Sequence, residues 1–557
     1  MRAWGPALFC AFGVLGACSG DARPPELGSQ GGSDDSADAG DGSVPSFGPV
    51  VDPNDDPTTC AEAEAWQSYV GCDYWPTVVA NNVWSIFDFA VVVANAGASP
   101  AAVTITGPAG TSQSQTVAPD TLAKFYLPWI PALKGSDSDT CGNSTPLAAS
   151  VIATGAAYHL VSSVPVTVYQ FNALEYAGKG GPAGKDWSTC PGNQVCSDMG
   201  SPNYGASLGC FSFTNDSSLL LPTTALTGNY RVTAFPGQSE QGSGGKATPV
   251  MSSYLAITAT ANATSVRVLL SPTGDIVAGA GVQATPAGGE LDLTLDAGDV
   301  AELVSDLGDT FDLSGSLVIA DQPVQVISGA PCDQVPQAAP ACDHLEQSVF
   351  PAETLGKQYF VSMPTSPLGS PVGHVVRMYG NVDGTVLTYA PAVPPGCPAT
   401  LDAGQVADCG VVQSDFEVTG SHEFAVGTFM LGGSIVDPSG GLGDPSQSMI
   451  ASVEQYRTKY VFLAPDDYVN SAIDVIAPSG ADMILDGTSV NWGLRTAIAD
   501  GYDVWRVGLL ETSNGAHTLE ASTPVGIQVL GYGLYTSYQY PAGLNLKHIA
   551  PPPGPTQ

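Results

Sequence analysis

The run Cys342-Asp343-His344-Leu345-Glu346 places two carboxylates and an imidazole close together in the chain. Carboxylate oxygens and imidazole nitrogens are common ligands for divalent cations in proteins. An aspartate next to a turn also caps backbone amides readily. Asp216 and Asp444 occupy comparable places near two neighbouring repeats, and this recurrence favours capping. The sequence therefore predicts no definite metal site, and the weak candidates are Asp343, His344 and Glu346.

Two other aspartate-rich turns have the composition of a calcium site. They contain the pair Asp466-Asp467 and the residues Asp296 and Asp299. Calcium prefers several clustered oxygen ligands, but the spacing here does not match the loop of an EF-hand. The sequence thus predicts no cofactor, and bound Ca²⁺ is the weaker alternative.

The segment 174–210 carries Tyr176, Lys185 and Trp187 among three cysteines. Recognition residues often lie on loops that a rigid scaffold holds in place, and aromatic and basic side chains are common among them. The alternative is a cross-linked insertion whose Trp187 packs against its own module. We take Tyr176, Lys185 and Trp187 as the ligand-binding candidates.

Two well-known catalytic motifs are absent from the sequence. It contains no His-Glu-x-x-His and no Walker loop, and its six histidines are scattered singly. The chain is therefore predicted not to be an enzyme. A glycosidase requires only two carboxylates, so a carbohydrate-active hydrolase is the least favoured alternative.

The N-terminus resembles the export signal of a bacterial lipoprotein. A short apolar stretch, too short to span a bilayer, ends in Leu15-Gly16-Ala17-Cys18, which matches a lipobox. This pattern predicts lipidation at Cys18, and Ser19 favours the outer membrane. The following residues are rich in Gly, Ser, Asp and Pro, with little apolar surface to bury, and predict a disordered tether.

The charge of the chain restricts its partners. Its formal net charge is −37, from 53 acidic and 16 basic residues. Nucleic-acid binding depends on neutralising phosphates with basic side chains, so this class of function is excluded. Attachment to a membrane is expected through the lipid anchor alone.

The cysteines predict an oxidising compartment. Of the 12 cysteines, Cys10 leaves with the signal peptide and Cys18 takes lipid. The even number that remains in an exported chain predicts disulfides. Their spacing suggests the pairs Cys60–Cys72, Cys190–Cys196, Cys332–Cys342 and Cys397–Cys409, which leaves Cys141–Cys210.

A strand pattern recurs four times. Each copy places valines or other apolar residues in alternation behind a shared position, which is Pro165, Pro323, Glu423 or Pro524. Alternation points these side chains to one face of a sheet, and proline fits at a strand entrance where no amide is needed. With 65 glycines and 45 prolines, the composition favours strands and turns over helices.

We therefore expect an all-β fold of about four tandem β-sandwich modules, with a β-propeller-like arrangement as the alternative. The predicted segments are a signal peptide (1–17), a disordered linker (18–59), module 1 (60–173), a disulfide-rich insertion (174–210), module 2 (211–341), module 3 (342–445), module 4 (446–545) and a disordered Pro-rich tail (546–557).

Several runs occur together as in one known family. They include Tyr69-Val70-Gly71-Cys72, Phe87-Asp88-Phe89, Leu219-Leu220-Leu221-Pro222, Ala341-Cys342-Asp343-His344 and Gly443-Asp444-Pro445-Ser446. The chain resembles the IgG-Fc-binding protein N-terminal domain family over about residues 66–545, as found in lipoproteins of myxobacteria-like species. The resemblance implies a cell-surface binding or adhesion protein for a glycoprotein, glycan or other extracellular ligand. A structural surface-coat or spacer lipoprotein is the alternative.

Overall fold

The computed structural model describes residues 56–145, 147–239, 242–243, 246–247, 250–337, 339–490, 493–509 and 515–553. The predicted signal peptide 1–17, the lipidation at Cys18, the linker before residue 56 and the end of the tail lie outside the described residues. Within the described part, no helix is long and apolar enough to cross a membrane. The account below concerns the unit Val51–Gln557.

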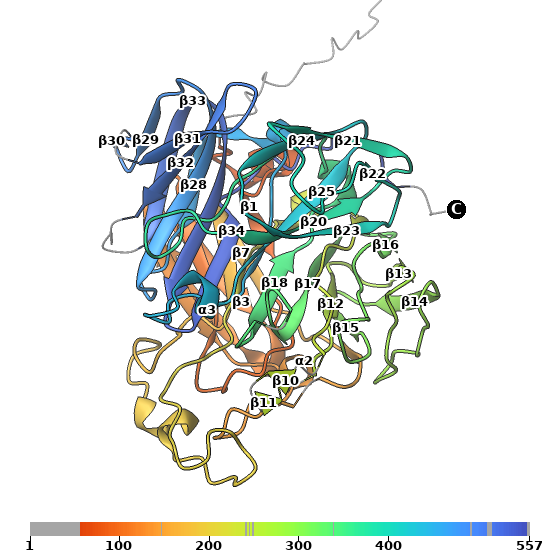
Figure 1. The fold of residues 1–557 in the computed structure, drawn as a ribbon, viewed down its shortest axis with the longest axis vertical. Coiled ribbons are helices and arrows are strands. Elements are labelled where there is room, and N and C mark those ends of the chain that lie inside the picture. Colours follow the sequence, from red (N-terminus) through yellow and green to blue (C-terminus); the bar gives the residue numbers. More distant parts are fainter. Residues whose placement is uncertain are drawn as a thin grey trace, which may run out of the picture. The chain divides into compact units, whose positions relative to one another are not determined.

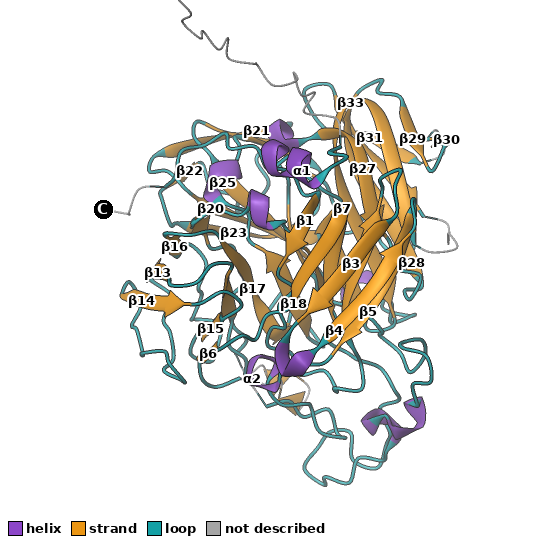
Figure 2. Cartoon of the chain, turned by 180° about the vertical axis from the view of Figure 1, so that it is seen from behind, coloured by secondary structure: helices purple, strands orange, loops and turns teal. Residues whose placement is uncertain are grey.

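Almost all regular structure is β-strand, which confirms the all-β prediction (Figure 2). The α-helices of the described residues are short: α1 (Cys60–Trp66), α2 (Pro131–Lys134) and α3 (Gly433–Val436). Helix α1 begins at a capping box, in which Thr59 and Glu62 each accept a hydrogen bond from the other's backbone amide. The scarcity of helix-forming residues explains why strands dominate.

The strands follow one another along the chain in four groups (Figure 1). The first group is β1 (Gly71–Tyr74), β2 (Phe89–Asn95), β3 (Ala101–Thr106), β4 (Ser112–Val117), β5 (Thr121–Leu127), β6 (Val151–Ala153), β7 (His159–Asn172) and β8 (Ser217–Leu219). The second is β9 (Asn229–Arg231), β10 (Gly242–Ser243), β11 (Lys246–Ala247), β12 (Tyr254–Ala259), β13 (Thr264–Leu269), β14 (Glu290–Leu295), β15 (Val300–Val304), β16 (Leu317–Ala320), β17 (Val324–Asp333) and β18 (Asp343–Ser348).

The third group is β19 (Gln358–Val361), β20 (His374–Gly380), β21 (Thr385–Ala390), β22 (Thr400–Leu401), β23 (Val406–Val412), β24 (Phe416–Gly420), β25 (Phe424–Met430) and β26 (Gln447–Met449). The fourth is β27 (Arg457–Leu463), β28 (Asn470–Pro478), β29 (Met483–Leu485), β30 (Thr488–Ser489), β31 (Leu494–Ala497), β32 (Tyr502–Gly508), β33 (Ala516–Gly533) and β34 (Thr536–Pro541).

Each group forms an inner antiparallel layer with the same strand order. The four orders are β8-β7-β2-β5, β18-β17-β12-β15-β6, β26-β25-β20-β23 and β34-β33-β28-β32-β31. Strand β6 of the first group completes the inner layer of the second, and β10 and β11 pair with each other in a separate two-stranded sheet. The other strands of each group form an outer layer; in the second group, for example, its order is β14-β13-β16-β9. A hydrophobic core fills the space between the two layers. In the second group this core includes Leu255, Val266 and Val326. Each group is thus a β-sandwich.

The repeated proline position marks where the chain passes from the outer to the inner layer. Strand β33 pairs with β29 and most of β27 before Pro524 and with β28 and β34 after it. In the second group the same passage divides the strand, so that β16 ends before Pro323 and β17 begins after it. Proline is tolerated here because the ladder partner changes at this point.

The innermost strands meet in a closed ring. Strand β8 contacts β18 and β34, and β26 contacts the same two strands. The four inner layers therefore surround one axis, which is a four-bladed, propeller-like arrangement built from sandwiches. The middle of this ring is polar, since it contains buried Asp216, Glu346, Gln447 and Ser537.

These pairings differ from the predicted module limits at three places. The limits at 211, 342 and 446 assign β8, β18 and β26 to the following module. In the structure, each of these strands pairs with the long strand that precedes it. In addition, β6 from the first predicted module pairs with β15 in the second. Short polar strands after a loop gave no local signal of their partner.

The predicted tail 546–557 is anchored at its start. Leu546 is buried, and the amide of Ile549 donates to the carbonyl of Glu353 at 2.8 Å. Residues 546–550 therefore pack against the turn that contains Glu353 and do not form a disordered extension.

Candidate binding site

The insertion 174–210 is held by two disulfides that differ from the predicted pairs. Cys141 bonds to Cys196 and Cys190 bonds to Cys210. The expected Cys190–Cys196 and Cys141–Cys210 bonds are therefore wrong, because loop spacing does not report which cysteines meet in space. The pairs Cys60–Cys72, Cys332–Cys342 and Cys397–Cys409 form as predicted.

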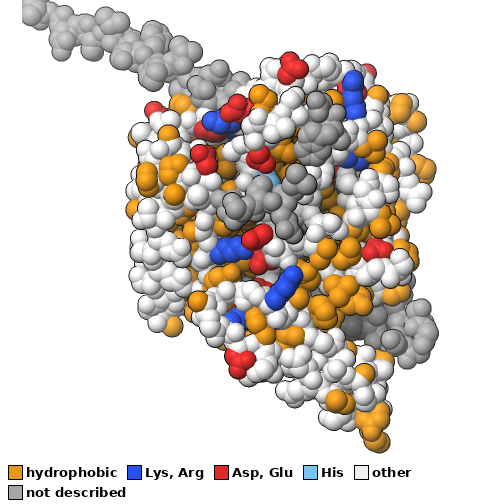
Figure 3. All heavy atoms as spheres, turned by 90° about the vertical axis from the view of Figure 1, so that its left-hand side faces the viewer, with side chains coloured by type: hydrophobic (Ala, Val, Ile, Leu, Met, Phe, Trp, Pro, Cys, Tyr) orange, Lys and Arg blue, Asp and Glu red, His pale blue; other side chains and the backbone are white. Residues whose placement is uncertain are grey.

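Between these two disulfides lies a loop with exposed apolar side chains. Val195, Met199 and Tyr204 are 61%, 82% and 57% exposed. Two hydrogen bonds of Cys196 hold the two sides of the loop together: its amide donates to the carbonyl of Ala206 at 2.8 Å, and its carbonyl accepts from the amide of Gly205 at 2.9 Å. We call Val195, Met199 and Tyr204 the apolar tip. Figure 3 views the molecule from the left-hand side of Figure 1. It shows hydrophobic side chains at the lower end, where the yellow loop of Figure 1 lies.

The predicted ligand residues of the insertion do not lie on this tip. Tyr176 is buried and its ring lies 5.5 Å from that of Tyr468. Trp187 is half-buried against Phe87, with ring centroids 5.2 Å apart. The ammonium of Lys185 lies over the Trp187 ring at 4.4 Å. The three side chains thus support the loop. The residues of the apolar tip could be identified only from their exposure in the folded chain, not from the sequence.

Tyr176 does line a cleft with a volume of about 340 Å³. One wall is β5, which contributes Lys124 and Tyr126, and another is the segment 175–181. The third side is the turn that carries Asp466 and Asp467. Chain segments from the first group, the insertion and the fourth group therefore form one cleft, which we call the polar cleft.

The polar cleft contains a partly buried ion-pair network. The Nζ atom of Lys124 lies 2.7 Å from Oδ1 of Asp466 and 2.6 Å from Oδ2 of Asp467. Burial opposes the charge of Lys124, but the two carboxylates outweigh it and raise the pKa of the ammonium. Burial and the adjacent Asp88 raise the pKa of Glu175 to about 8, although Lys185 opposes this shift.

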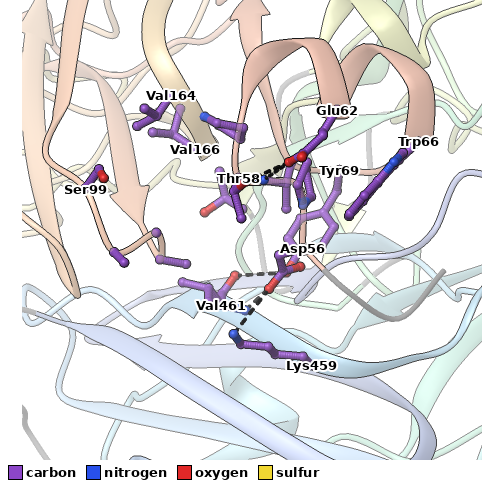
Figure 4. Close-up of a pocket in the computed structure, with 17 residues that line it drawn as sticks. Asp56, Thr58, Glu62, Trp66, Tyr69, Ser99, Val164, Val166, Lys459 and Val461 are labelled. Carbon is purple, nitrogen blue, oxygen red and sulfur yellow. Dashed lines mark hydrogen bonds and ion pairs between the residues drawn. The ribbon is translucent and has the colours of Figure 1, made fainter. Parts of the chain in front are cut away.

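A second hollow, of about 490 Å³, lies beside α1 (Figure 4). Trp66, Tyr69, Val166 and Val461 give it apolar walls, and Lys459 lies at its edge. The hydroxyl of Tyr69 accepts from the amide of Val461 at 3.1 Å, so this side of the hollow is fixed by the packing of the first group on the fourth.

The residues Asp343, His344 and Glu346 are all buried in β18, close to the central ring. Oδ1 of Asp343 accepts from the amides of His344 and Asn215, and Oδ2 accepts from the hydroxyl of Thr536 at 2.9 Å. This aspartate therefore caps backbone amides, and it does so across three groups of strands rather than within one turn. Burial holds its pKa well above the usual range.

Glu346 accepts hydrogen bonds from the side-chain amides of Gln170 and Asn172, and Nε2 of His344 lies 3.4 Å from one of its oxygens. Among the described residues, no group of three or more His, Cys, Asp or Glu side chains is arranged to hold a metal ion. At the predicted calcium position Asp466-Asp467, the ammonium of Lys124 already forms ion pairs with both carboxylates.

Comparison with known proteins identifies the family. The family model described as "IgGFc binding protein" matches residues 216–531, which is more than half of the chain. The chain belongs to the IgGFc-binding protein family. A relative is the human IgGFc-binding protein, which is 28% identical over 342 residues. The aligned part is 61% of this chain and 6% of the human protein, so the chain spans only a small part of that relative's length. No solved structure matches.

The matched region of the IgGFc-binding family begins at Asp216 and ends in β33. It contains the second and third groups of strands and most of the fourth. The insertion 174–210, with its apolar tip, lies outside the match, as does Lys124 of the polar cleft. These features are therefore particular to the part of this chain that the family model does not match.

Proposed function

We propose that this chain is a non-catalytic, lipid-anchored protein of a bacterial surface that binds an extracellular glycoprotein. The observation that carries this proposal is the apolar tip, because its side chains are exposed while their backbone is fixed by two disulfides. Apolar side chains on a rigid loop lose little conformational freedom when a partner covers them. Such residues often supply most of the affinity at protein interfaces.

Membership of the IgGFc-binding family supports a protein ligand that carries glycans, since the human relative is named for binding the Fc part of IgG. Attachment to the outer membrane is proposed from the lipobox at Cys18, and the partner is then met outside the cell. Replacing Cys18 by Ala should release the protein from the membrane fraction. Retention of the Cys18→Ala variant in that fraction would refute the anchor.

The binding proposal is tested with the purified chain against immobilised IgG Fc, mucin and an array of glycans. We expect saturable binding to a glycoprotein, weakened at least about tenfold by the combined substitution Val195→Ser, Met199→Ser and Tyr204→Ser. A matched control replaces exposed apolar residues on another module, Leu368→Ser with Val393→Ser, which are 68% and 59% exposed. Equal loss in both variants would show that the tip is not the binding surface. Silence across the array would favour a coat or spacer protein.

A further inference from the structure

The polar cleft presents hydrogen-bonding groups in fixed positions. Lys124 bridges Asp466 and Asp467, whose side chains are 48% and 14% exposed. Among the described residues, the hydrogen bonds to this pair use Oδ1 of Asp466 and Oδ2 of Asp467. The second oxygen of each carboxylate is therefore oriented by the ion pair and can accept from a ligand.

A buried carboxyl group lies beside this pair. Glu175 is 1% exposed, and its Oε2 accepts from the amide of Asp88 at 2.9 Å. Its Oε1 lines the cleft region without a hydrogen-bond partner in the described part of the chain, and Nζ of Lys185 lies 3.6 Å away. Buried polar atoms nearly always form hydrogen bonds in folded proteins. The ion pair with Lys185 is too long to be one, so an oxygen without a hydrogen bond beside a cleft indicates a place for a ligand or water.

Two glycines allow the backbone to lie close to this oxygen of Glu175. Gly181 has φ +80°, and a Cβ atom at this position would lie 2.5 Å from Oε1 of Glu175. Gly180 also has a positive φ, +76°. Side chains are disfavoured at both positions, which leaves the space beside the carboxyl group open.

Two tyrosine rings complete the lining. Tyr126 is half-buried on β5, and Tyr176 is fixed by its contact with Tyr468. The exposed Lys179 holds its ammonium 5.4 Å from the centre of the Tyr176 ring. The cleft therefore combines carboxylate acceptors, ammonium donors and flat apolar surfaces within a volume that is typical of small-molecule sites.

The balance of charges selects the class of ligand. A metal ion would have to displace Lys124 from its two carboxylates. A strongly anionic ligand would meet Asp466, Asp467 and Asp88, and a cationic one would compete with three lysines. A neutral molecule whose hydroxyl groups both donate and accept satisfies every group in the cleft.

We propose that the polar cleft binds a neutral saccharide unit, with adjacent hydroxyls on Asp466 and Asp467 and a carbon face against the half-buried ring of Tyr126. This inference rests on the proposed function, since a glycoprotein offers a protein surface to the apolar tip and a sugar to the cleft. The two sites are nevertheless separate, and each can be tested alone.

The test uses the purified full chain and single methyl glycosides of glucose, galactose, mannose and N-acetylglucosamine, followed by saturation-transfer NMR. At least one glycoside should bind, and Asp466→Asn should weaken it about tenfold, as expected for the loss of a hydrogen bond to a charged group. Glu175→Gln should weaken the same glycoside. The matched control is Asp292→Asn, because Asp292 also pairs with a basic residue, Arg267, at 2.9 Å and is exposed.

Absence of binding at tens of millimolar, or binding unaffected by Asp466→Asn and Glu175→Gln, would overturn the saccharide site. The variant without the apolar tip distinguishes this failure from that of the proposed function. If that variant keeps glycoside binding while the chain binds no glycoprotein, the cleft stands and the proposed function fails. If glycoprotein binding survives complete deglycosylation of the partner and no glycoside binds, the tip stands and the cleft fails.

Discussion

The hydroxyl of Tyr230 donates a hydrogen bond to the backbone carbonyl of Val324 at 2.7 Å. The same bond recurs in every group of strands, always to the residue that follows the repeated proline position. The other pairs are Tyr74 with Val166, Tyr359 with Phe424 and Tyr460 with Val525. This contact ties the first strand of each group to the point where the long strand changes layer.

Replacing Tyr230 by Phe should lower the free energy of unfolding by about 1–2 kcal/mol, because the buried carbonyl of Val324 loses its donor. The measurement is the midpoint of urea unfolding. Tyr204→Phe removes a hydroxyl from a tyrosine that is 57% exposed and serves as the control, with no expected change. Equal shifts in the two variants would contradict a structural role of the Tyr230 bond.

Asp216 connects three groups of strands near the central ring. Its Oδ2 accepts from the amides of Glu346 and Gln447 at 3.0 and 2.9 Å, and its Oδ1 accepts from the hydroxyl of Ser446 at 2.8 Å. Asp216→Ala would leave these buried donors unsatisfied, and each costs about 1–3 kcal/mol. We expect a loss of more than about 3 kcal/mol in chemical unfolding. An exposed carboxyl, removed by Asp292→Ala, should change stability little, and a similarly small effect at Asp216 would argue against the cap.

The burial of the His374 imidazole leads to a prediction of how stability depends on pH. It is fully buried in β20, and within the described part of the chain neither ring nitrogen has a hydrogen-bond partner. Burial, and to a lesser degree the charge of Arg506, lower its pKa from 6.5 to about 3. Between these two values the unfolded chain binds a proton that the folded chain does not, so stability is lost as pH falls below 6.5.

His374→Phe should therefore reduce the acid destabilisation between pH 6.5 and about 4, measured as the change of the unfolding midpoint with pH. The buried carboxyl groups of the ring titrate in both proteins, so the difference between variant and parent isolates the histidine. His422 is exposed on the surface, and His422→Phe is the control. Parallel pH profiles for the parent and His374→Phe would refute the prediction.

The disulfides of the insertion can be examined directly. A peptide map without reduction should contain one peptide joining Cys141 to Cys196 and another joining Cys190 to Cys210. Replacing both Cys190 and Cys210 by Ser should speed limited proteolysis within residues 191–209, because the loop loses its constraint. The same double substitution at Cys397 and Cys409 should leave cleavage there unchanged. A map with Cys190 joined to Cys196 would contradict the structure.

Much of the fold could be predicted from local patterns. The strands with apolar alternation behind Pro165, Pro323, Glu423 and Pro524 form where the sequence places them. Alternation and turn residues act over a few positions, so the chain itself reports them. Three disulfides of short spacing, such as Cys332–Cys342, follow for the same reason, whereas the still shorter Cys190–Cys196 pair does not form.

The tertiary structure alone decided how these strands associate. Lys124 and Asp466 are 342 positions apart, yet they form one side of the polar cleft. The sequence favours a capping role for Asp343, but it does not reveal the partners Asn215 and Thr536, which come from other groups of strands. The loop that carries Cys190 shows no pattern that distinguishes Cys196 from Cys210 as its partner. Local patterns determined which segments become strands, whereas the ring, the cleft and the exposed tip depend on packing between distant segments, whose energies no local pattern contains.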